Sequence, residues 1–305
     1  MAETELSALE DHLKEAHQRF LGAVETVRPD LHRYCSRMLG SAVDGEDAVQ
    51  ETLTQAYYKL SLLKQDVPLR AWLFRIAHNK CVDWLRLRRG ESLPLDEAED
   101  VPVETEDEAE RRQLVGLALR EVVETLPPKE RTCLILKDVL DCSLQEIGAI
   151  LDSPLTAVKA ALHRARGKLK GQAPAASRRE PEPVRLALIE RYVALFNAQR
   201  WEELKLLLRD DVRLEVVGDF VAEGQDAIGT AYFYKYSQYA GWRLEIGRVD
   251  GEVMIIVWRR EEPEEAEKPW SVVRIAWKEG QVAGLRDYIL VPYLFDEAAL
   301  EPLAP

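Results

Sequence analysis

Residues 143–169 constrain the fold of this chain most tightly, because their pattern specifies two short helices joined by a sharp turn. Ser143 and Glu146 have the spacing of a capping box, in which the serine hydroxyl and the glutamate carboxylate satisfy each other's backbone N–H groups. Gly148 has no side chain, so a second helix can cross the first one closely. The first helix is expected to bury one apolar face, made by Leu144, Ile147, Ile150 and Leu151.

The second helix follows the segment Asp152-Ser153-Pro154, which predicts the turn. We expect Ser153 to be the N-cap and Pro154 to occupy the first helical position. Three apolar residues are predicted to face inward: Val158, Leu162 and Leu169. The outward face is predicted to carry Thr156, Lys159, Ala160, His163, Arg164, Arg166 and Lys168.

A basic outward face after such a turn is typical of a DNA-recognition helix. Its N-terminal part can reach base edges, and its basic C-terminal turns can meet phosphate. The alternative is an amphipathic helical hairpin whose basic face is only solvated. The cap, the turn and the one-sided charge together favour contact with DNA.

The net charge of −13 is unusual for a protein that binds nucleic acid, but the charge is unevenly distributed. Residues 70–89 hold six Lys or Arg and one acid, and residues 156–170 hold five Lys or Arg and no acid. Residues 91–110 hold ten Asp or Glu and no base. Because local patches contact phosphate, the overall sign does not exclude DNA as a partner.

The segment upstream, residues 6–90, predicts one compact helical domain. A first helix ends at Gly40-Ser41, a second opens with acids at 44–47, and a third follows a loop that contains Pro68. The acidic stretch 91–110 has two prolines and too few large apolar residues for a core, so it predicts a tether. Helices resume at about Arg111 and continue to Leu169.

Several segments resemble motifs of the extracytoplasmic-function (ECF) branch of the sigma-70 family, in the order that the family shows. Residues 45–52 (GEDAVQET) resemble its polymerase-clamp-binding helix. The promoter-melting helix is resembled by residues 70–80 (RAWLFRIAHNK) and 82–86 (VDWLR). The family's fourth region is resembled by residues 126–131 (LPPKER) and 158–166 (VKAALHRAR).

The resemblance implies that the chain binds core RNA polymerase and promoter DNA. The polymerase would be contacted by one face of the second helix, with Asp47, Gln50, Glu51 and Thr54. The −10 promoter element would be contacted by the loop from Leu60 to Arg70 and by Arg70, Arg75, Asn79, Lys80, Arg86, Arg88 and Arg89. The −35 element would be contacted by the outward face of the recognition helix.

Other features fit the resemblance less closely or leave alternatives open. Trp72 and Trp84 share helical spacing with apolar neighbours, so we assign both to the core. The acidic stretch resembles the linker that such factors thread through the RNA path of the polymerase, and a soluble spacer is the alternative. The family often carries Arg at the position of Ala161 and Gly at that of Asp152, which leaves the −35 sequence open.

From Val184 onward the pattern changes to that of an α+β domain. Two predicted helices reach to about Leu208, and alternating runs then predict a half-buried antiparallel sheet with the helices on one face. The predicted strands are 212–217, 242–249, 253–260, 270–277 and 281–291. This order, with residues 210–212 (DDV) and 224–228 (GQDAI), resembles the SnoaL-like, cone-shaped members of the NTF2-like superfamily.

Such a cone implies an apolar pocket that can hold a small-molecule ligand. Its aromatic residues either line that pocket or only form core: Tyr232, Phe233, Tyr236, Tyr239, Trp242, Trp258, Trp277 and Tyr288. Enzymes of the superfamily place an acid/base carboxylate in the cone, and that position falls near Val216, which cannot carry protons. Asp219 and Asp287 are the possible substitutes, and the sequence marks neither as buried or paired. We therefore expect no enzymatic activity.

The fold class expected is multidomain, with two all-α sigma domains followed by an α+β NTF2-like cone. The predicted boundaries are 1–90 for the first helical domain, 91–112 for an acidic linker, 113–171 for the helix-turn-helix domain, 172–183 for an Ala/Pro linker and 184–305 for the cone. The function expected is transcription initiation regulated in cis by the cone. The alternatives are a ligand-sensing helix-turn-helix regulator and a small-molecule enzyme with an accessory helical domain.

Cysteines and histidines give no sign of a metal or a cofactor, and none is expected. The four cysteines are scattered without a C-x-x-C pair, which predicts buried free thiols, and the five histidines lack metal-ligand spacing. No apolar run approaches the roughly 20 residues of a membrane span, and the acidic N-terminus does not resemble a secretion signal. We expect a cytoplasmic protein with no membrane partner.

Overall fold

The computed structural model describes residues 2–60, 68–89, 126–169, 183–238, 241–261 and 265–303. The chain divides into two compact units, Met1–Ala175 and Ala176–Pro305, and each unit has its own buried core. The linkers predicted at 91–112 and 172–183 lie outside the described residues, apart from Pro183. The domain boundaries at these linkers therefore stay predictions.

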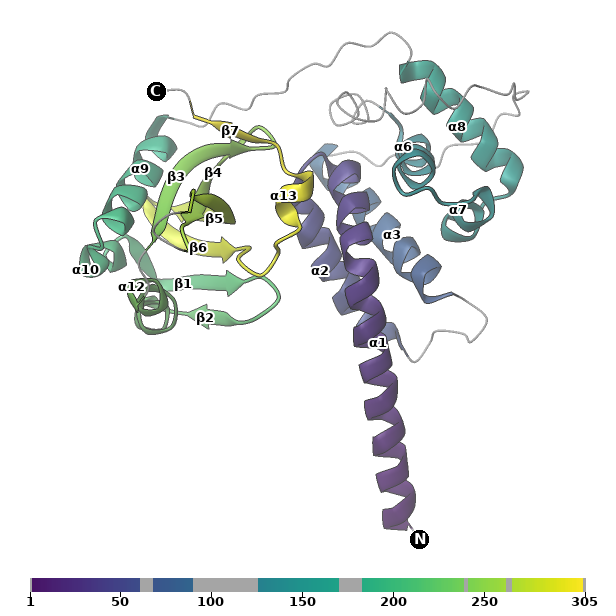
Figure 1. Cartoon of the computed structure of the whole chain (residues 1–305), viewed down its shortest axis with the longest axis horizontal. Coiled ribbons are helices and arrows are strands. Elements are labelled where there is room, and N and C mark those ends of the chain that lie inside the picture. Colours follow the sequence, from purple (N-terminus) through teal and green to yellow (C-terminus); the bar gives the residue numbers. More distant parts are fainter. Residues whose placement is uncertain are drawn as a thin grey trace. The chain divides into compact units, whose positions relative to one another are not determined.

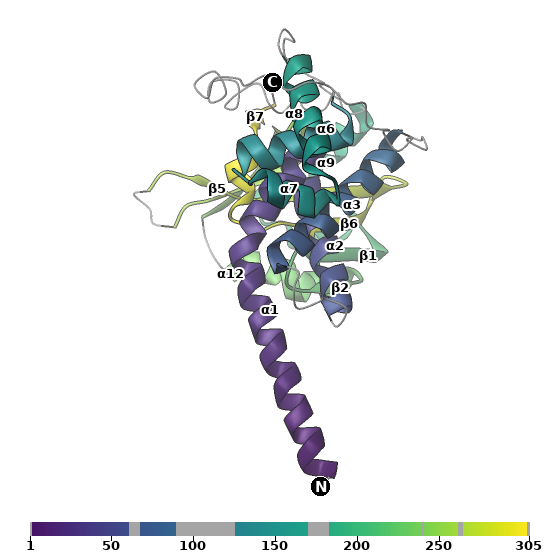
Figure 2. The same ribbon diagram turned by 90° about the vertical axis from the view of Figure 1, so that its right-hand side faces the viewer.

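The described part of the first unit consists of helices (Figure 1). They are α1 (Ala2–Leu39), α2 (Ala42–Lys59), α3 (Leu69–Arg89), α6 (Pro128–Leu134), the π-helical turn η2 (Ile135–Val139), α7 (Leu144–Leu151) and α8 (Leu155–Leu169). Figure 2 shows the N-terminal half of α1 extending away from the other helices of this unit.

The start of α2 is set by a serine cap and by a glycine. Ser41 is the N-cap, and its hydroxyl accepts a hydrogen bond from the backbone N–H of Asp44 at 3.2 Å. The helix therefore begins at Ala42, two residues earlier than its acids alone indicate. A Cβ atom at Gly45 would lie 2.6 Å from backbone atoms of Ser36, so only glycine lets α1 and α2 approach this closely.

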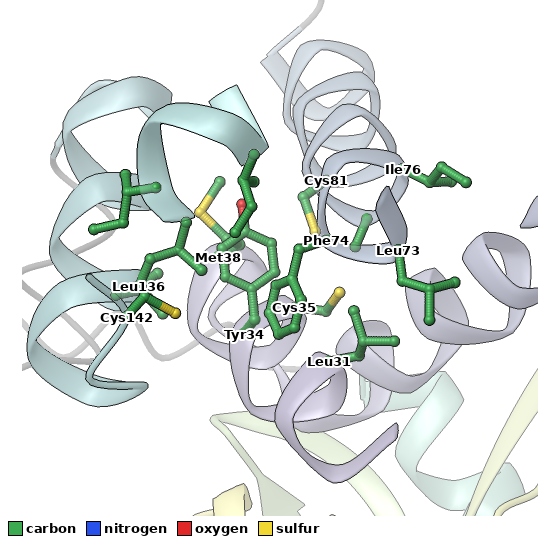
Figure 3. Close-up of a cluster of buried hydrophobic side chains, with 14 of the residues drawn as sticks. Leu31, Tyr34, Cys35, Met38, Leu73, Phe74, Ile76, Cys81, Leu136 and Cys142 are labelled. Atoms are coloured by element: carbon green, nitrogen blue, oxygen red, sulfur yellow. The ribbon is translucent and has the colours of Figure 1, made fainter. Parts of the chain in front are cut away.

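Buried side chains from α1, α3 and η2 meet in one continuous core (Figure 3). Tyr34 of α1 lies edge-on to Phe74 of α3, with ring centroids 5.6 Å apart. The core includes Leu31, Cys35, Met38, Leu73, Cys81, Leu136 and Cys142. The two helical regions that the sequence divides between residues 1–90 and 113–171 thus share one core. Trp72 and Trp84 pack against it with their rings partly exposed, as predicted.

The second unit places helices against a seven-stranded mixed sheet, with strand order β2-β1-β6-β5-β4-β3-β7 (Figure 1). The strands are β1 (Leu208–Val216), β2 (Val221–Glu223), β3 (Trp242–Val249), β4 (Glu252–Arg259), β5 (Lys268–Lys278), β6 (Gln281–Asp287) and β7 (Leu300–Pro302). The helical elements are α9 (Pro183–Asn197), α10 (Trp201–Lys205), α11 (Gln225–Ile228), the π-helical turn η3 (Gly229–Phe233), α12 (Tyr234–Gln238) and α13 (Leu294–Glu297).

The prediction of a wholly antiparallel sheet is wrong at one pair of strands. β1 runs parallel to β6, with Leu214 opposite Leu285, whereas the other neighbouring strands are antiparallel. Parallel neighbours need a long connection, and here it contains α11, η3, α12 and the four strands β2, β3, β4 and β5. The alternation of apolar residues marks strands but not their direction, and it does not detect the three-residue strands β2 and β7.

Helix α9 is fastened to the sheet through an asparagine. The Asn197 amide donates to the backbone carbonyl of Leu244 at 2.9 Å and accepts from the Leu244 N–H at 2.8 Å. Around this link, apolar side chains of α9, η3 and the strands form the core of the unit, including Ile189, Tyr192, Phe196, Phe233, Ile255 and Val273. The α+β architecture expected from the sequence is confirmed.

Candidate nucleic-acid interface

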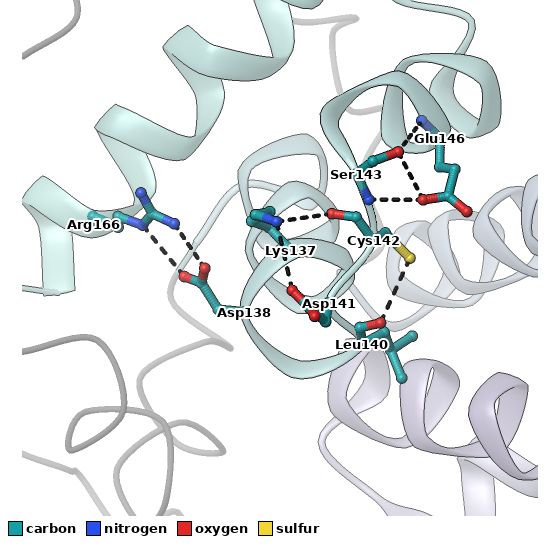
Figure 4. Close-up of polar contacts among 8 residues, drawn as sticks. All are labelled: Lys137, Asp138, Leu140, Asp141, Cys142, Ser143, Glu146 and Arg166. Carbon is teal, nitrogen blue, oxygen red and sulfur yellow. Dashed lines mark hydrogen bonds and ion pairs between the residues drawn. The ribbon is translucent and has the colours of Figure 1, made fainter. Parts of the chain in front are cut away.

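The capping box at the start of α7 is present as predicted (Figure 4). The Ser143 hydroxyl accepts from the Glu146 N–H at 3.2 Å, and the Glu146 carboxylate accepts from the Ser143 N–H at 2.7 Å. Because the carboxylate also accepts from the Ser143 hydroxyl, the pKa of Glu146 lies below its ordinary value. The first helix of the helix-turn-helix therefore begins where the sequence places it.

The turn between α7 and α8 depends on a left-handed residue and on a glycine. Asp152 ends α7 with φ 50°, a left-handed conformation that Asp adopts more readily than most residues. A Cβ atom at Gly148 would lie 2.9 Å from the Ser153 carbonyl oxygen, which confirms the close approach expected there. The N-cap prediction is wrong by one residue. The Pro154 carbonyl accepts from the Val158 N–H, and the Ser153 hydroxyl donates to the Leu151 carbonyl.

The recognition helix α8 exposes only part of its predicted DNA-contacting face. Thr156 and Lys159, on its first turns, are exposed, as is Lys168, and His163 is half-buried. Ala160 is only 4% exposed, so its predicted outward position is wrong. Its neighbour Ala161 is fully buried in the core, and both small side chains let α8 pack closely against the unit.

The basic residues further along α8 are tied to acids of their own unit. Arg164 pairs with Glu130 at 2.9 Å, and Lys168 pairs with the same carboxylate at 2.8 Å. Arg166 pairs with Asp138 at 2.7 Å (Figure 4). Both acids are nearly buried, with side chains 4% and 8% exposed, so these pairs hold α8 against α6 and η2. The N-terminal turns are the part of α8 whose basic charge is not engaged in this way.

Residues 61–67 of the loop predicted to contact the −10 element lie outside the described residues. The individual side chains predicted to contact this element lie on α3, and most of them take part in polar contacts. The Arg75 guanidinium donates to the Ala149 carbonyl of α7, and Asn79 is exposed. Four others lie in ion pairs: Arg70 with Asp30, Lys80 with Glu51, Arg86 with Asp83 and Arg88 with Asp44. Arg89 is the last residue of α3.

The residues predicted to contact the polymerase do not form one exposed face. Glu51 and Thr54 are exposed and Gln50 is half-buried, but Asp47 is buried. The Glu51 carboxylate accepts from the indole N–H of Trp84 at 3.3 Å and pairs with Lys80 at 3.2 Å. Glu51, which is predicted to contact the polymerase, and Lys80, which is predicted to contact DNA, are thus joined by an ion pair.

Sequence reasoning missed a buried polar cluster between α1, α3 and α6. The Tyr34 hydroxyl, the Thr132 hydroxyl and His78 Nδ1 lie within 3.1 Å of one another. Burial lowers the pKa of His78 to about 4 and raises the pKa of Tyr34 well above its ordinary value, so both are neutral at pH 7. Each residue looks like ordinary helix sequence, and only the fold brings the three together.

The second unit holds a buried carboxylate that the sequence did not mark. Asp287, at the end of β6, accepts from the hydroxyls of Tyr232 at 2.6 Å, Tyr236 at 3.0 Å and Ser271. Burial raises its pKa even though these donors oppose the shift. Asp219, the other carboxylate considered, is exposed. The sequence does not mark Asp287 as buried or paired, and the structure shows that it is both.

The cysteines are buried free thiols, as predicted. Burial raises the pKa of Cys133 to about 12 and also raises the pKa of Cys35 and Cys142, so these thiols are poor nucleophiles. Within the described part of the chain, no three His, Cys, Asp or Glu side chains are grouped to hold a metal ion. None of the described helices is both long and apolar enough to span a membrane.

Comparison with known proteins places sigma-factor regions on the first unit. The family model for sigma-70 region 2 matches residues 23–91, and that for sigma-70 region 4 matches residues 116–169. The chain is 32% identical to the ECF RNA polymerase sigma factor SigD of Mycobacterium bovis over 164 residues, which cover 50% of this chain and 76% of that protein.

Two further similarities extend the comparison. ECF RNA polymerase sigma factor SigG of Mycobacterium tuberculosis is 32% identical over 207 residues, 59% of this chain and 56% of SigG, so the chain spans about half the length of that relative. The crystal structure of a putative ketosteroid isomerase from Kribbella flavida is 25% identical, with a TM-score of 0.27, and the match covers 33% of this chain and 73% of that one.

Proposed function

The chain belongs to the extracytoplasmic-function sigma factors of the sigma-70 family, and on that basis we propose that it binds core RNA polymerase and directs transcription initiation at promoters. The observation that carries the proposal is the pairing of the α2–α3 hairpin with a capped helix-turn-helix in one chain. A regulator that only binds DNA has no need for the first of these elements. The family is one of non-enzymatic transcription factors, and the protein would act in the cytoplasm.

Contact with the −35 element is proposed for the start of α8. Thr156 and Lys159 are exposed there, at the end of the helix that reaches base edges in helix-turn-helix proteins. We assign phosphate contacts to Lys168 and to the other basic residues of α8, Arg164 and Arg166. Their ion pairs fix their guanidinium and ammonium groups in place and also reduce the charge that they offer to DNA.

Contact with the −10 element is proposed for α3, where Asn79 and Arg75 are exposed. The polymerase clamp is proposed to meet the exposed residues Glu51 and Thr54 of α2. Because Glu51 also pairs with Lys80, a substitution at Glu51 can disturb both surfaces, and Thr54 is the cleaner position at which to test the clamp.

Regulation in cis is proposed for the C-terminal domain. Asp287, Tyr232 and Tyr236 form a buried polar cluster in this domain, with oxygen–oxygen distances of 2.6 and 3.0 Å to the carboxylate, and we propose that a small-molecule ligand of the domain is the regulating signal. An anti-sigma partner is a further possible regulator, since the sigma factor RpoE was solved in complex with the anti-sigma factor NepR from Bartonella quintana.

Run-off transcription with core polymerase tests the proposal, on promoters enriched from genomic DNA. We expect initiation by the full chain, and a change in its rate for residues 1–175 would show that the C-terminal domain regulates it. If the chain binds duplex DNA but neither binds core nor initiates, the ligand-sensing helix-turn-helix regulator becomes the better explanation.

A further inference from the structure

Two arginine–tryptophan pairs lie next to each other where β3 begins and β4 ends. Arg259 is paired in register with Trp242, and its guanidinium carbon lies 4.9 Å from the centroid of that indole. Arg243 is paired in register with Trp258, at 5.5 Å. Successive residues of a strand face opposite sides of a sheet, so the two pairs lie on different faces. Trp242 packs against the core of the C-terminal domain, which places the first pair on the face that carries this core.

The two arginines differ in how their charge is neutralised. Arg243 pairs with Glu267 at 2.8 Å and with Glu245 at 2.9 Å. Arg259 pairs with Glu261 at 3.8 Å, and the side chains of these two residues are 31% and 49% exposed. An ion pair this long and this exposed contributes little free energy. Arg259 is therefore an accessible cation that an anion from solution can engage without breaking a strong contact.

A second indole reaches Arg259 through an irregularity in β5. Ser271 and Pro269 pair with consecutive residues of β4, so Trp270 between them is the extra residue of a β-bulge. Bulges re-orient a side chain relative to the regular strand. The Trp270 centroid lies 4.4 Å from the guanidinium carbon of Arg259, and the ring is half-buried at an interplanar angle of 77° to Trp242. The arginine is thus held between two aromatic rings.

The indole N–H of Trp242 is buried, and no acceptor lies within reach of it among the described residues. Buried tryptophan N–H groups usually have a partner. Trp258 and Trp277 share this lack, so the unpaired donor does not define a site by itself. Trp242 differs from them in lying against the weakly neutralised Arg259, and a carboxylate bound by that arginine would supply an acceptor after a turn of the indole ring.

A guanidinium binds a carboxylate through two parallel hydrogen bonds, and aromatic rings beside it add stacking. We propose that Arg259, Trp242 and Trp270 form a binding site for a small aromatic carboxylate, with its charge on Arg259 and its ring on Trp270. This inference rests on the proposed function and names the chemical class of the regulating ligand. The site adjoins the buried polar cluster, because the Trp242 ring lies 5.1 Å from that of Tyr236, whose hydroxyl donates to Asp287.

The test is calorimetric titration of the full chain with two probes, 1-naphthoate and its uncharged analogue 1-naphthamide. We expect the wild type to bind 1-naphthoate more tightly. Arg259→Gln should weaken binding of 1-naphthoate about tenfold, the loss of a charged hydrogen-bond donor, and leave binding of 1-naphthamide unchanged. Unchanged binding of the amide also shows that the variant is folded. Trp270→Leu should weaken binding of both probes about fivefold, because both lose the same stacking contact.

Arg243→Gln is the matched control. It removes the other arginine that lies over a tryptophan, on the opposite face of the sheet, and should change the affinity for neither probe. The inference is overturned if the wild type binds the two probes equally or not at all, or if Arg243→Gln weakens 1-naphthoate as much as Arg259→Gln does. Run-off transcription is measured separately. A chain that initiates transcription without binding 1-naphthoate contradicts only this inference, and one that binds it as expected without initiating contradicts only the proposed function.

Discussion

The guanidinium of Arg131 donates a hydrogen bond from Nη1 to the backbone carbonyl of Met38, with an N–O distance of 2.5 Å. Arg131 belongs to α6 and is 1% exposed, and Met38 lies in the last turn of α1. The carbonyls of a last turn lack partners within their own helix and carry partial negative charge, which a cation satisfies. Nη2 also donates to the Leu126 carbonyl at 3.3 Å.

Replacing Arg131 with leucine should destabilise the first unit. Two carbonyls would lose a charged donor, and hydrogen bonds to charged groups contribute about 1.5–3 kcal/mol each. We expect a loss of about 3 kcal/mol in the free energy of unfolding, measured as faster hydrogen exchange of the α6 amides in the full chain. Arg86→Leu is the control, since Arg86 pairs with the exposed Asp83 and its loss should cost less than about 1 kcal/mol. Equal effects of the two substitutions would contradict the role given to Arg131.

The buried His78 should make the first unit sensitive to acid. The unfolded chain binds a proton near pH 6.5, whereas the native imidazole stays neutral until about pH 4. Because the unfolded state binds more protons in this window, stability is complete above about pH 6.5 and falls as the pH falls toward 4, by up to about 3 kcal/mol.

The measurement is the free energy of unfolding at several values between pH 7 and pH 5. His78→Gln removes the titrating group and should flatten this dependence. The interpretation fails if the wild type and His78→Gln lose stability in parallel.

Lys159 and Arg164 lie on the same helix but should respond differently to substitution. Lys159→Ala is expected to weaken binding to promoter duplex and to reduce the slope of log affinity against log salt by about 0.9, at unchanged melting temperature. Arg164→Ala should also lower the melting temperature, because it leaves the nearly buried Glu130 with one cation fewer. Binding across a salt series, together with thermal unfolding, checks both, and a melting temperature lowered by Lys159→Ala would count against the assignment.

Asp287 should be essential to the stability of the C-terminal domain. Asp287→Ala leaves the hydroxyls of Tyr232, Tyr236 and Ser271 without their acceptor, and each buried orphan donor costs about 1–3 kcal/mol. We expect a loss above about 3 kcal/mol, read from hydrogen exchange of the β6 amides. The exposed Asp219 provides the control, and Asp219→Ala should change stability by less than about 0.5 kcal/mol.

Local sequence signals predicted the helix-turn-helix well, because they act over a few residues. The Ser143–Glu146 box and Gly148 are each explained by contacts within ten residues. The partners of Arg164 and Lys168 could not be predicted, because Glu130 lies more than 30 residues earlier and looks like any surface acid. Helical periodicity was likewise too coarse for Ala160. It placed this residue on the exposed face of α8, although the residue lies just inside the buried face.

In the C-terminal domain the sequence predicted where strands lie better than how the strands pair and which polar side chains become buried. The strand Trp242–Val249 matches its prediction at both ends. The parallel pairing of β1 with β6 depends on how the chain crosses between them, which alternation does not record. The burial of Asp287 depends on hydroxyls that lie 51 and 55 residues earlier, so no local pattern could reveal it.

The hydrogen bond from Arg75 to the Ala149 carbonyl of α7 has a consequence for binding equilibria. A phosphate that takes this N–H group as its donor can bind only after α7 releases it. Under the proposed function, the apparent dissociation constant for promoter DNA is then the intrinsic constant divided by the fraction of chains in which α3 is free of α7. A substitution that favoured, by about tenfold, the arrangement in which α7 holds Arg75 would weaken promoter binding by about the same factor. The altered side chain need not contact DNA for this effect.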